Sequence, residues 1–359
     1  MKIAQVAPVW VSVPPKKYGG AEKIISLLSD ELVSRGHDVT LFASGDSKTK
    51  AKLHSICDQA PGLTKDAQMN IVNNMNHLFN MFSAIEKQNE FDIIHWHLSK
   101  DLAPIMFANT TKTPSLITIH NHFYDEEMTQ MKPIFEHYKQ FPNFVSISNY
   151  HRKYFPFNFL ETVYNGIDLS EFDLNETPED YMVWIGRFEY QKGIDTAIKA
   201  AIELKIKLKI AAPLDENPFY FERIKPFLEN EYIDYVGEID SAERNKLLKN
   251  AKLLVNPIRW DEPFGLVVPE ANACGVPVVA YQRGAMPEII KENVNGNIVS
   301  QDDFPALIAA IKKIYAMPEN EYREFRVRAR KHVEENFTYQ IMTKNYEKAY
   351  QRIKKKWLF

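Results

Sequence analysis

The sequence predicts an α/β fold made of two doubly wound domains, and three observations support this prediction. Short apolar runs of strand length alternate with helical patterns along the 359 residues. Most of these runs are apolar throughout, which is typical of parallel strands covered by helices on both faces. A strand, a glycine-bearing loop and a helix occur at residues 2–35 and again at 181–204, so the pattern starts twice.

The first half is predicted to contain five strands. They cover residues 3–7, 39–43, 92–96, 115–119 and 144–147. Between the first two strands, residues 21–35 carry apolar side chains at helical spacing, namely Ile24, Leu28 and Leu32. This helix is expected to end at Gly36, because glycine commonly terminates helices.

The second half is predicted to contain five more strands. They cover residues 181–185, 208–211, 233–236, 253–256 and 276–280. Residues 164–181, with the acidic segment 176–180, separate the halves and are the predicted linker. Two Rossmann-like domains that face each other across a cleft are the simplest architecture, with the ligand at the carboxyl ends of the strands.

Composition narrows the functional class. The formal net charge of −3 gives no reason to expect a nucleic-acid partner. Cys57 and Cys274 make neither a disulfide framework nor a zinc site, so a reducing cytoplasm fits best. No apolar run approaches the ~18 residues of a membrane span. Residues 1–13 lack the basic stretch and cleavage site of a signal peptide, so we interpret them as a buried strand and a loop.

The strongest chemical motif lies at residues 260–271. It follows a predicted strand and opens a helix, with Glu262 on the loop and Glu270 in the first turns. Carboxylates accept hydrogen bonds from adjacent hydroxyls. The N–H groups around Gly265 and Leu266 are of the kind with which a helix start binds phosphate. The motif predicts a site for a ligand with hydroxyls and phosphate, and an ordinary capped helix with solvated acids is the alternative.

Two further loops carry phosphate-binding features. Residues 186–193 follow the strand 181–185 and contain Arg187 and Lys192, whose charges could neutralise a diphosphate leaving group. The segment Tyr18-Gly19-Gly20-Ala21-Glu22 begins the first helix, and its glycines would let backbone amides approach a phosphate or a sugar. A solvated surface loop and a plain glycine turn are the respective alternatives. No dinucleotide fingerprint or P-loop sequence is present.

Two His-x-His pairs allow a different interpretation. His95 with His97, and His120 with His122, would each share one face of a strand and could bind a metal ion. A metal-dependent hydrolase would complete such a site with aspartates, namely Asp92, Asp101 and Asp125. Alternatively, the histidines line a ligand site at the strand ends and bond to sugar or to backbone.

Taken together, the motifs resemble the retaining glycosyltransferases of family four, which have the two-domain GT-B fold. The resemblance covers nearly the whole chain. It includes residues 18–22, 36–39, 118–120, 165–168, 186–193, 236–238, 262–270, 273–278 and 284–288. The chain departs from the pattern at residues 211–213, Ala-Ala-Pro, where many relatives carry glycine, and this weakens the match on the base side of the site.

The resemblance implies a role for each matched residue. Arg187 and Lys192 would bind the diphosphate in place of a metal ion, so no cofactor would be required. Glu262 would hold hydroxyls of the donor sugar, and Glu270 would hold the ribose hydroxyls. The remaining donor contacts would come from His120 to the sugar, Gly20 near the phosphate, Gly237 and Glu238 at the base, and the backbone of Phe264, Gly265 and Leu266.

The implied reaction is transfer of a hexose from a nucleotide-diphosphate sugar, with a UDP-sugar favoured by family frequency. The acceptor would be a saccharide, a lipid-linked glycan or a small molecule, as in polysaccharide biosynthesis. The anomeric configuration would be retained by front-face attack, and the chain contains no Asp-x-Asp metal motif. A nucleotide-sugar epimerase, a phosphorylase and a non-catalytic binder are the alternatives on this scaffold.

The resemblance also implies the domain organisation. Residues 1–164 would form the acceptor-side domain, with Tyr150 and Asn165 on that side, and residues 165–337 would bind the nucleotide-sugar. A final helix, 338–359, would pack back on the first domain. The aromatic stretch 138–159 could contact sugars or a lipid carrier, although interdomain packing is the commoner use.

The tail 354–359 contains three lysines. These suit either the end of a helix or peripheral contact with an anionic membrane at the cytoplasmic face. No motif predicts the oligomeric state.

Overall fold

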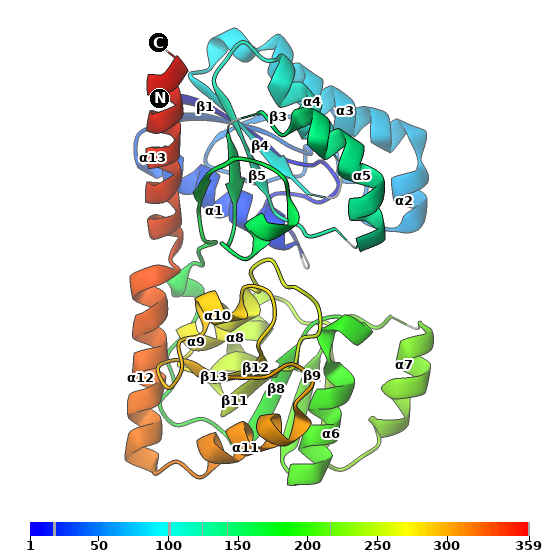
Figure 1. The fold of residues 1–359 in the computed structure, drawn as a ribbon, viewed down its shortest axis with the longest axis vertical. Helices are drawn as coiled ribbons and strands as arrows, with labels where there is room; N and C mark the ends of the chain where they lie inside the picture. Colours follow the sequence, from blue (N-terminus) through cyan, green and yellow to red (C-terminus); the bar gives the residue numbers. More distant parts are fainter. Residues whose placement is uncertain (17–18, 100–101, 124, 142, 216, 358–359) are drawn as a thin grey trace. The chain divides into compact units, whose positions relative to one another are not determined.

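The computed structural model describes residues 1–16, 19–99, 102–123, 125–141, 143–215 and 217–357. Figure 1 shows the two compact units that the chain forms. Unit 1 contains Met1–Gly166 and Tyr339–Phe359, and unit 2 contains Ile167–Thr338. Each unit has its own parallel sheet flanked by helices, so the predicted α/β fold class is confirmed.

Unit 1 contains a seven-stranded sheet in the order β3-β2-β1-β4-β5-β6-β7. Its strands are β1 (Lys2–Val6), β2 (Asp38–Phe42), β3 (Lys52–His54), β4 (Ile93–Leu98), β5 (Ser115–Ile119), β6 (Phe144–Ser146) and β7 (Phe159–Thr162). The strand order reverses between β1 and β4. In doubly wound sheets this switch point is where ligands bind, beside the carboxyl ends of the strands.

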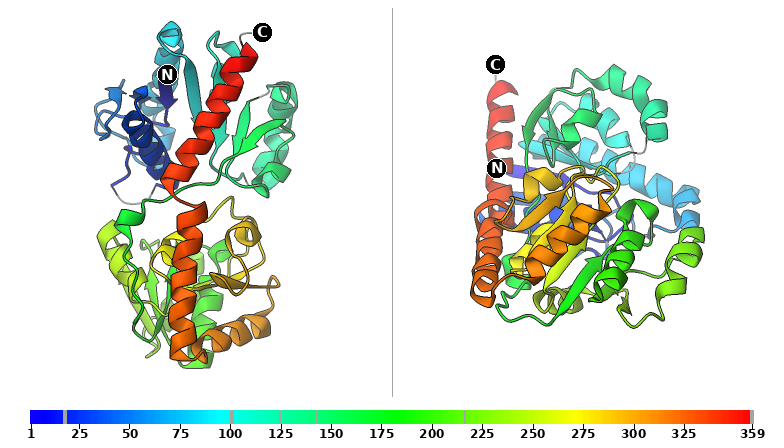
Figure 2. Two further views of the ribbon diagram at one scale, coloured as in Figure 1. Left: turned by 90° about the vertical axis from the view of Figure 1, so that its left-hand side faces the viewer. Right: turned by 60° about the horizontal axis from the view of Figure 1, so that its bottom comes forward.

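The helices of unit 1 cover both faces of its sheet. They are α1 (Gly20–Ser34), α2 (Lys65–Met69), α3 (Ile71–Glu86), α4 (Ala103–Thr110), α5 (Asp125–Tyr138) and α13 (Tyr339–Trp357). Figures 1 and 2 show α1 and α13 together on one side, and α3, α4 and α5 on the other. Among the described residues, no helix combines the length and apolar character needed to cross a membrane.

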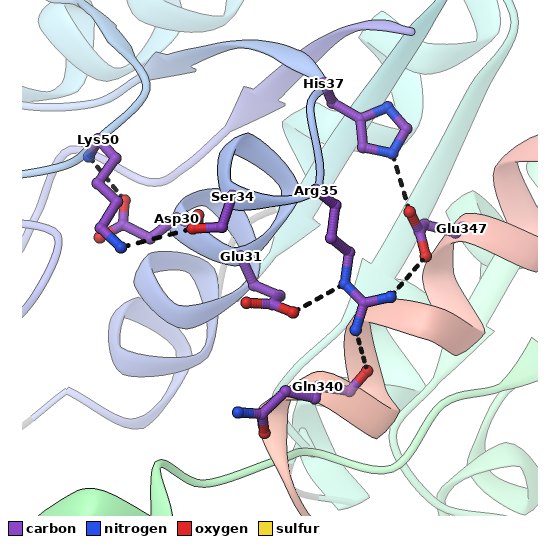
Figure 3. A network of polar contacts seen from close by, with 8 residues as sticks. All are labelled: Asp30, Glu31, Ser34, Arg35, His37, Lys50, Gln340 and Glu347. Carbon is purple, nitrogen blue, oxygen red and sulfur yellow. Dashed lines mark hydrogen bonds and ion pairs between the residues drawn. The ribbon is translucent and has the colours of Figure 1, made fainter.

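A polar network attaches α13 to α1 (Figure 3). Arg35, at the end of α1, donates to Glu31 at 2.8 Å, to Glu347 at 3.2 Å and to the carbonyl oxygen of Gln340 at 3.1 Å. The second oxygen of Glu347 lies 2.9 Å from His37 Nε2. Because one guanidinium reaches both helices, the last helix is held on the unit that contains the N-terminus.

Unit 2 contains a six-stranded sheet in the order β10-β9-β8-β11-β12-β13. Its strands are β8 (Tyr181–Ile185), β9 (Lys207–Ala211), β10 (Ile233–Gly237), β11 (Leu253–Asn256), β12 (Val278–Tyr281) and β13 (Gly296–Val299). Its helices are α6 (Ile194–Leu204), α7 (Pro218–Arg223), α8 (Ser241–Lys249), α9 (Val267–Ala273), α10 (Met286–Ile289), α11 (Phe304–Tyr315) and α12 (Glu319–Asn336). Here the order reverses between β8 and β11, so the loops after these two strands meet at the switch point.

All ten predicted strands are present, and three further strands were not predicted. β3 has three residues and is largely exposed, so it has no apolar run. β7 lies in the aromatic stretch that we expected to pack between domains or to meet an acceptor. β13 begins with glycine and asparagine, which are uncommon in strands.

Candidate functional site

The loop after β11 carries Glu262, and the loop after β8 carries Lys192 (Figure 1). Lys192 Nζ donates to Glu262 Oε2 at 2.7 Å, and Trp260 Nε1 donates to the same oxygen at 2.8 Å. The ammonium also lies 4.5 Å from the centroid of the Trp260 ring. The structure therefore brings together a cation and an acid that the sequence motifs place 70 residues apart.

The loop after β8 is held by close backbone packing. Lys192 ends a short 3₁₀ turn, and Gly193 follows with a φ of +70°. A Cβ atom at Gly193 would lie 1.9 Å from the carbonyl oxygen of Pro257, so only glycine fits. The two loops thus touch through their backbones as well as through the Lys192–Glu262 pair.

Arg259 joins the same two loops and was missed by the sequence motifs. Its guanidinium donates to both carboxylate oxygens of Asp195 at 2.7 and 3.0 Å and to Thr196 Oγ1 at 2.6 Å. Its backbone N–H donates to Gln191 at 2.8 Å. No local pattern could have identified Arg259, because Asp195 lies 64 residues earlier in the chain.

A third loop, which follows β12, contacts the backbone of Glu262. Ala285 N–H donates to the carbonyl oxygen of Glu262 at 2.9 Å. Gly284 has a φ of +56°, and a Cβ there would lie 2.3 Å from the backbone of Glu262. The segment 284–288, noted in the sequence only as part of the family pattern, therefore fixes the position of the acid.

Arg187 is the second predicted cation of this site. Its guanidinium lies 3.1 Å from the carboxylate of Glu189, and its side chain is about a third exposed. Arg187 and Lys192 thus share one loop, and each is paired with an acid of unit 2. The motifs identified both cations but did not show which acids lie beside them, because these pairings depend on the folded loops.

Glu270 lies in the first turn of α9 and is buried, with 1% of its surface exposed. Arg244 Nη1, from α8, lies 3.2 and 3.0 Å from its two carboxylate oxygens. Glu270 is therefore paired with a cation from α8, and Arg244 is a second residue that the motifs missed. Leu266 caps α9, while Phe264 is buried against Phe337.

Of the remaining predicted base-side residues, Gly237 is the last residue of β10, and Glu238 follows it in the loop before α8. Gly237 has a φ of +85°, and a Cβ there would meet no atom within 4 Å. The loop is therefore open at this position. α8 itself is held by a capping box between Asp240 and Glu243, which fixes the start of the helix that carries Arg244.

In unit 1, His120 follows β5 and belongs to a buried polar chain. Its Nε2 lies 2.9 Å from His97 Nδ1, and His97 Nε2 lies 2.7 Å from Gln5 Oε1. Because an amide oxygen only accepts, His97 donates from Nε2 and accepts at Nδ1, so His120 donates from Nε2. Its Nδ1 is then an acceptor. Burial lowers the pKa of His120 to about 3, which keeps the ring neutral at physiological pH.

The partners of His95 and His97 argue against the metal-site interpretation. His95 Nδ1 lies 2.8 Å from Tyr350 Oη, and its Nε2 lies 2.7 Å from Thr118 Oγ1. All four ring nitrogens of the pair are therefore engaged with protein atoms. Asp92 lies before β4, at the opposite end from His97, and binds Lys354 at 2.8 Å. Among the described residues, no group of three histidine, cysteine, aspartate or glutamate side chains could hold a metal ion.

The other predicted site residues of unit 1 lie in different elements and differ in burial. Gly20 is the first residue of α1, and Asn165 is buried. Tyr150 accepts a hydrogen bond from Tyr154 at 3.3 Å. Some predictions fall outside the described residues or side chains, namely Tyr18, Asp101, Asp125, Leu358 and Phe359.

The aromatic stretch is part of the core of unit 1. Phe155 and Phe157 are buried there, and Phe157 stacks on Phe144 with ring centroids 3.8 Å apart. The expectation that these aromatic rings pack between domains or meet an acceptor is therefore wrong for Phe155 and Phe157. Their neighbours are other rings of the same unit.

Comparison with known families gives two matches that together span most of the chain. The family profile of the glycosyl transferases group 1 matches residues 168–332. The profile of glycosyltransferase family 4 matches residues 18–171. The second match covers the helix that begins at Gly20, and the first covers the loops with Lys192 and Glu262 and the helix with Glu270.

Individual relatives are distant. An uncharacterized glycosyltransferase of Methanocaldococcus jannaschii is 28% identical over 211 residues, which cover 53% of each chain, so the match spans about half the length of that relative. Two solved structures share the fold over nearly the whole chain. Sucrose-phosphate synthase of Thermosynechococcus elongatus has a TM-score of 0.77 at 19% identity, covering 98% of both chains. HepE of Anabaena, in complex with UDP and glucose, has a TM-score of 0.73 at 17% identity, covering 97% of this chain and 98% of HepE.

Proposed function

Because this chain belongs to the group 1 glycosyltransferases of family 4, we propose that it transfers a hexose from a nucleotide-diphosphate sugar to a saccharide, lipid-linked or small-molecule acceptor. The observation that carries this proposal is the Lys192–Glu262–Trp260 cluster. It joins the loops after β8 and β11 at the switch point of the sheet in unit 2. A cation, an acid and an aromatic ring in one place suit a sugar attached to a phosphate.

Lys192 and Arg187 would neutralise the diphosphate as the bond from sugar to phosphate breaks. Lys192 is held in place by its ring and acid contacts, so little reorganisation is needed when charge develops on the leaving group. In this scheme the two side chains replace a metal ion. Removal of one such donor typically slows a reaction about 100- to 1,000-fold.

Glu262 and Glu270 would bind hydroxyls of the donor. Glu262 would accept from the sugar once Lys192 turns to the phosphate, and Glu270 would bind the ribose beside Arg244. Gly237 and Glu238 would lie near the base. The solved complex of HepE with UDP and glucose, which has the same fold, supports uridine as the base.

Retention of the anomeric configuration would follow from front-face attack, in which the leaving phosphate takes the proton of the acceptor hydroxyl. His120 would accept a hydrogen bond from a donor-sugar hydroxyl at its Nδ1, while Gly20, Asn165 and Tyr150 would lie on the acceptor side. The reaction would take place in the cytoplasm, with peripheral contact to the inner membrane face where the acceptor is lipid-linked.

A panel of nucleotide-sugars tests the proposal by thermal shift, followed by product analysis with each hit. We expect at least one nucleotide-sugar to stabilise the wild-type chain in the presence of a chelator. Arg187→Ala should lose most of that stabilisation, and Arg323→Ala, at a half-buried position on α12, should keep it.

Product analysis then separates the alternatives. NMR of the product should show the anomeric configuration of the donor. An inverted product would contradict the front-face mechanism. A 2-epimer would identify an epimerase instead, and phosphate-dependent turnover would identify a phosphorylase. Stabilisation without any turnover would identify a binding protein.

A further inference from the structure

Helix α3 buries polar and apolar side chains on one side and exposes apolar side chains on the other. The buried residues are His77, Asn80, Met81, Ser83 and Ala84. Asn80 Nδ2 donates to the carbonyl oxygens of Ala7 and Phe42 at 3.1 and 3.3 Å. These bonds fix the rotation of the helix about its own axis, so the opposite, apolar side must point outward. Figure 1 shows α3 at the outer edge of unit 1, on the side away from α13.

We name this outward surface the α2–α3 apolar face. It consists of Leu63, Met69, Ile71, Val72, Met75, Leu78, Phe79 and Phe82, all of them exposed. Ile71 is 75% exposed, Met69 73% and Phe79 50%. Contiguous apolar surface of this kind marks an interaction site in soluble proteins, because leaving it in water is unfavourable.

Hydrogen bonds hold α2 and α3 together, so the α2–α3 apolar face is one continuous surface. Asn73 Nδ2 donates to the carbonyl oxygen of Ala67 at 3.0 Å, and Asn74 Nδ2 donates to that of Gln68 at 2.8 Å. These bonds fasten α2 to the first turn of α3. The side chains that the short helix α2 and its preceding loop contribute are therefore fixed relative to those of α3.

The charge of α3 distinguishes between possible occupants. Residues 71–85 contain no lysine, arginine, aspartate or glutamate. Helices that bind membrane surfaces are rich in lysine and arginine, which α3 lacks. A neutral apolar face suits a protein surface of the same character, and two copies of α3 can approach without repulsion between like charges.

We propose that the α2–α3 apolar face is where a second copy of this chain docks about a two-fold axis. A two-fold dimer places the same patch on both sides of the interface, so an uncharged apolar patch complements itself. The eight side chains expose on the order of 800 Å² per chain, which is the contribution of each partner to an interface of standard size.

Light scattering after gel filtration tests this proposal on the full chain. We expect the wild type to elute with twice the 41.7 kDa mass of the chain. Phe79→Glu should weaken the dimer at least about 30-fold, as expected for a buried aromatic anchor. The matched control is Val327→Glu, an exposed apolar residue of α12 at 43% exposure, and it should remain dimeric.

Cysteine cross-linking provides a second readout that does not depend on weakening the interface. In a Cys57→Ser background, Leu78→Cys at the middle of α3 should form a disulfide-linked dimer under mild oxidation, whereas Val327→Cys should not. A monomeric wild type at every concentration would overturn the proposal, as would a Phe79→Glu variant that stays dimeric. A monomer that binds neutral lipid vesicles through Phe79 would identify a membrane as the occupant instead.

Discussion

At the residue scale, the charged groups of the candidate site are paired before any ligand is considered. Lys192 binds Glu262, and Glu270 binds Arg244. A diphosphate or a hydroxyl would therefore replace an existing partner rather than meet a bare charge. Such an exchange avoids the cost of leaving a buried charge without a partner, and it keeps the side chains oriented.

The buried histidines of unit 1 make a prediction about acid stability. Burial lowers the pKa of His120 and His151 to about 3 and lowers the pKa values of His95 and His97 well below the ordinary value. The unfolded chain protonates its histidines near pH 6.5, so between pH 6.5 and about 3 it binds more protons than the folded chain. The free energy of unfolding should therefore fall as the pH drops below 6.5.

Each such histidine should cost about 1.4 kcal/mol per pH unit below its unfolded pKa. Chemical unfolding of wild type at pH 7 and pH 5 measures this loss. His120→Gln should reduce the loss, and His137→Gln, at an exposed position on α5, should leave it unchanged. An equal pH dependence in wild type and His120→Gln would contradict the assignment of a neutral buried ring.

At the element scale, the contact between the loops after β8 and β11 depends on one glycine. Gly193 and Gly36 have similar positive φ values, +70° and +84°, but only Gly193 has a neighbour that would meet a Cβ atom. Gly36→Ala should cost about 1 kcal/mol, because alanine tolerates this conformation poorly. Gly193→Ala should cost more and also displace Lys192.

Denaturant unfolding measures the free energy of unfolding of both alanine variants. Both variants place alanine at a positive φ, but only Gly193→Ala also brings the new methyl group against a neighbouring atom. A larger loss of unfolding free energy in Gly193→Ala, together with loss of nucleotide-sugar binding, is the expected result. Equal losses in both variants, with binding intact, would show that the loop relaxes around the added methyl group.

Helix α12 is attached to unit 2 by one fully buried arginine. Arg326 donates to the carbonyl oxygens of Asn175, Lys249, Ala251 and Cys274 and to Tyr322 Oη. Arg326→Met removes every one of these donors and leaves the buried carbonyl groups unpaired. We expect a loss of about 3–5 kcal/mol in the free energy of unfolding.

Arg328→Met of the same helix is the matched control, because the Arg328 side chain is only half-buried and its ion pair lies on the surface, and it should change the free energy of unfolding by less than about 0.5 kcal/mol. Comparable stability of the two variants would mean that packing of α12, rather than the bonds of Arg326, holds the helix.

The sequence predicted best those features that depend on a continuous stretch of chain, namely the strands and the loop motifs. Every predicted strand is present, because most buried parallel strands carry a nearly continuous apolar run that the sequence shows directly. The loops with Lys192 and Glu262 were also identified from local motifs. The motifs could not predict Arg244, whose partner Glu270 lies 26 residues away, or the Lys192–Glu262 pair. These contacts depend on which loops the sheet order brings together.

At the scale of the whole molecule, the chain starts in unit 1, forms unit 2 and returns to unit 1 through α13. The return brings Tyr350 to His95 and to Gln5, the residue that sets the hydrogen-bond direction of His97 and His120. The last helix thus contributes to the buried polar chain behind a candidate ligand-binding residue of unit 1. Residue spacing in the sequence does not reveal this contribution, because 345 residues separate Gln5 from Tyr350.

The central claim is that the Lys192–Glu262 pair of unit 2 binds the sugar-diphosphate. Isothermal titration with the best nucleotide-sugar, in the presence of a chelator, tests it most directly when wild type is compared with Lys192→Met and with Arg323→Met as control. We predict clear binding to wild type and to Arg323→Met, and at least about tenfold weaker binding to Lys192→Met, since a charge-assisted bond contributes roughly 1.5–3 kcal/mol. Equal affinity for all three proteins would contradict the claim.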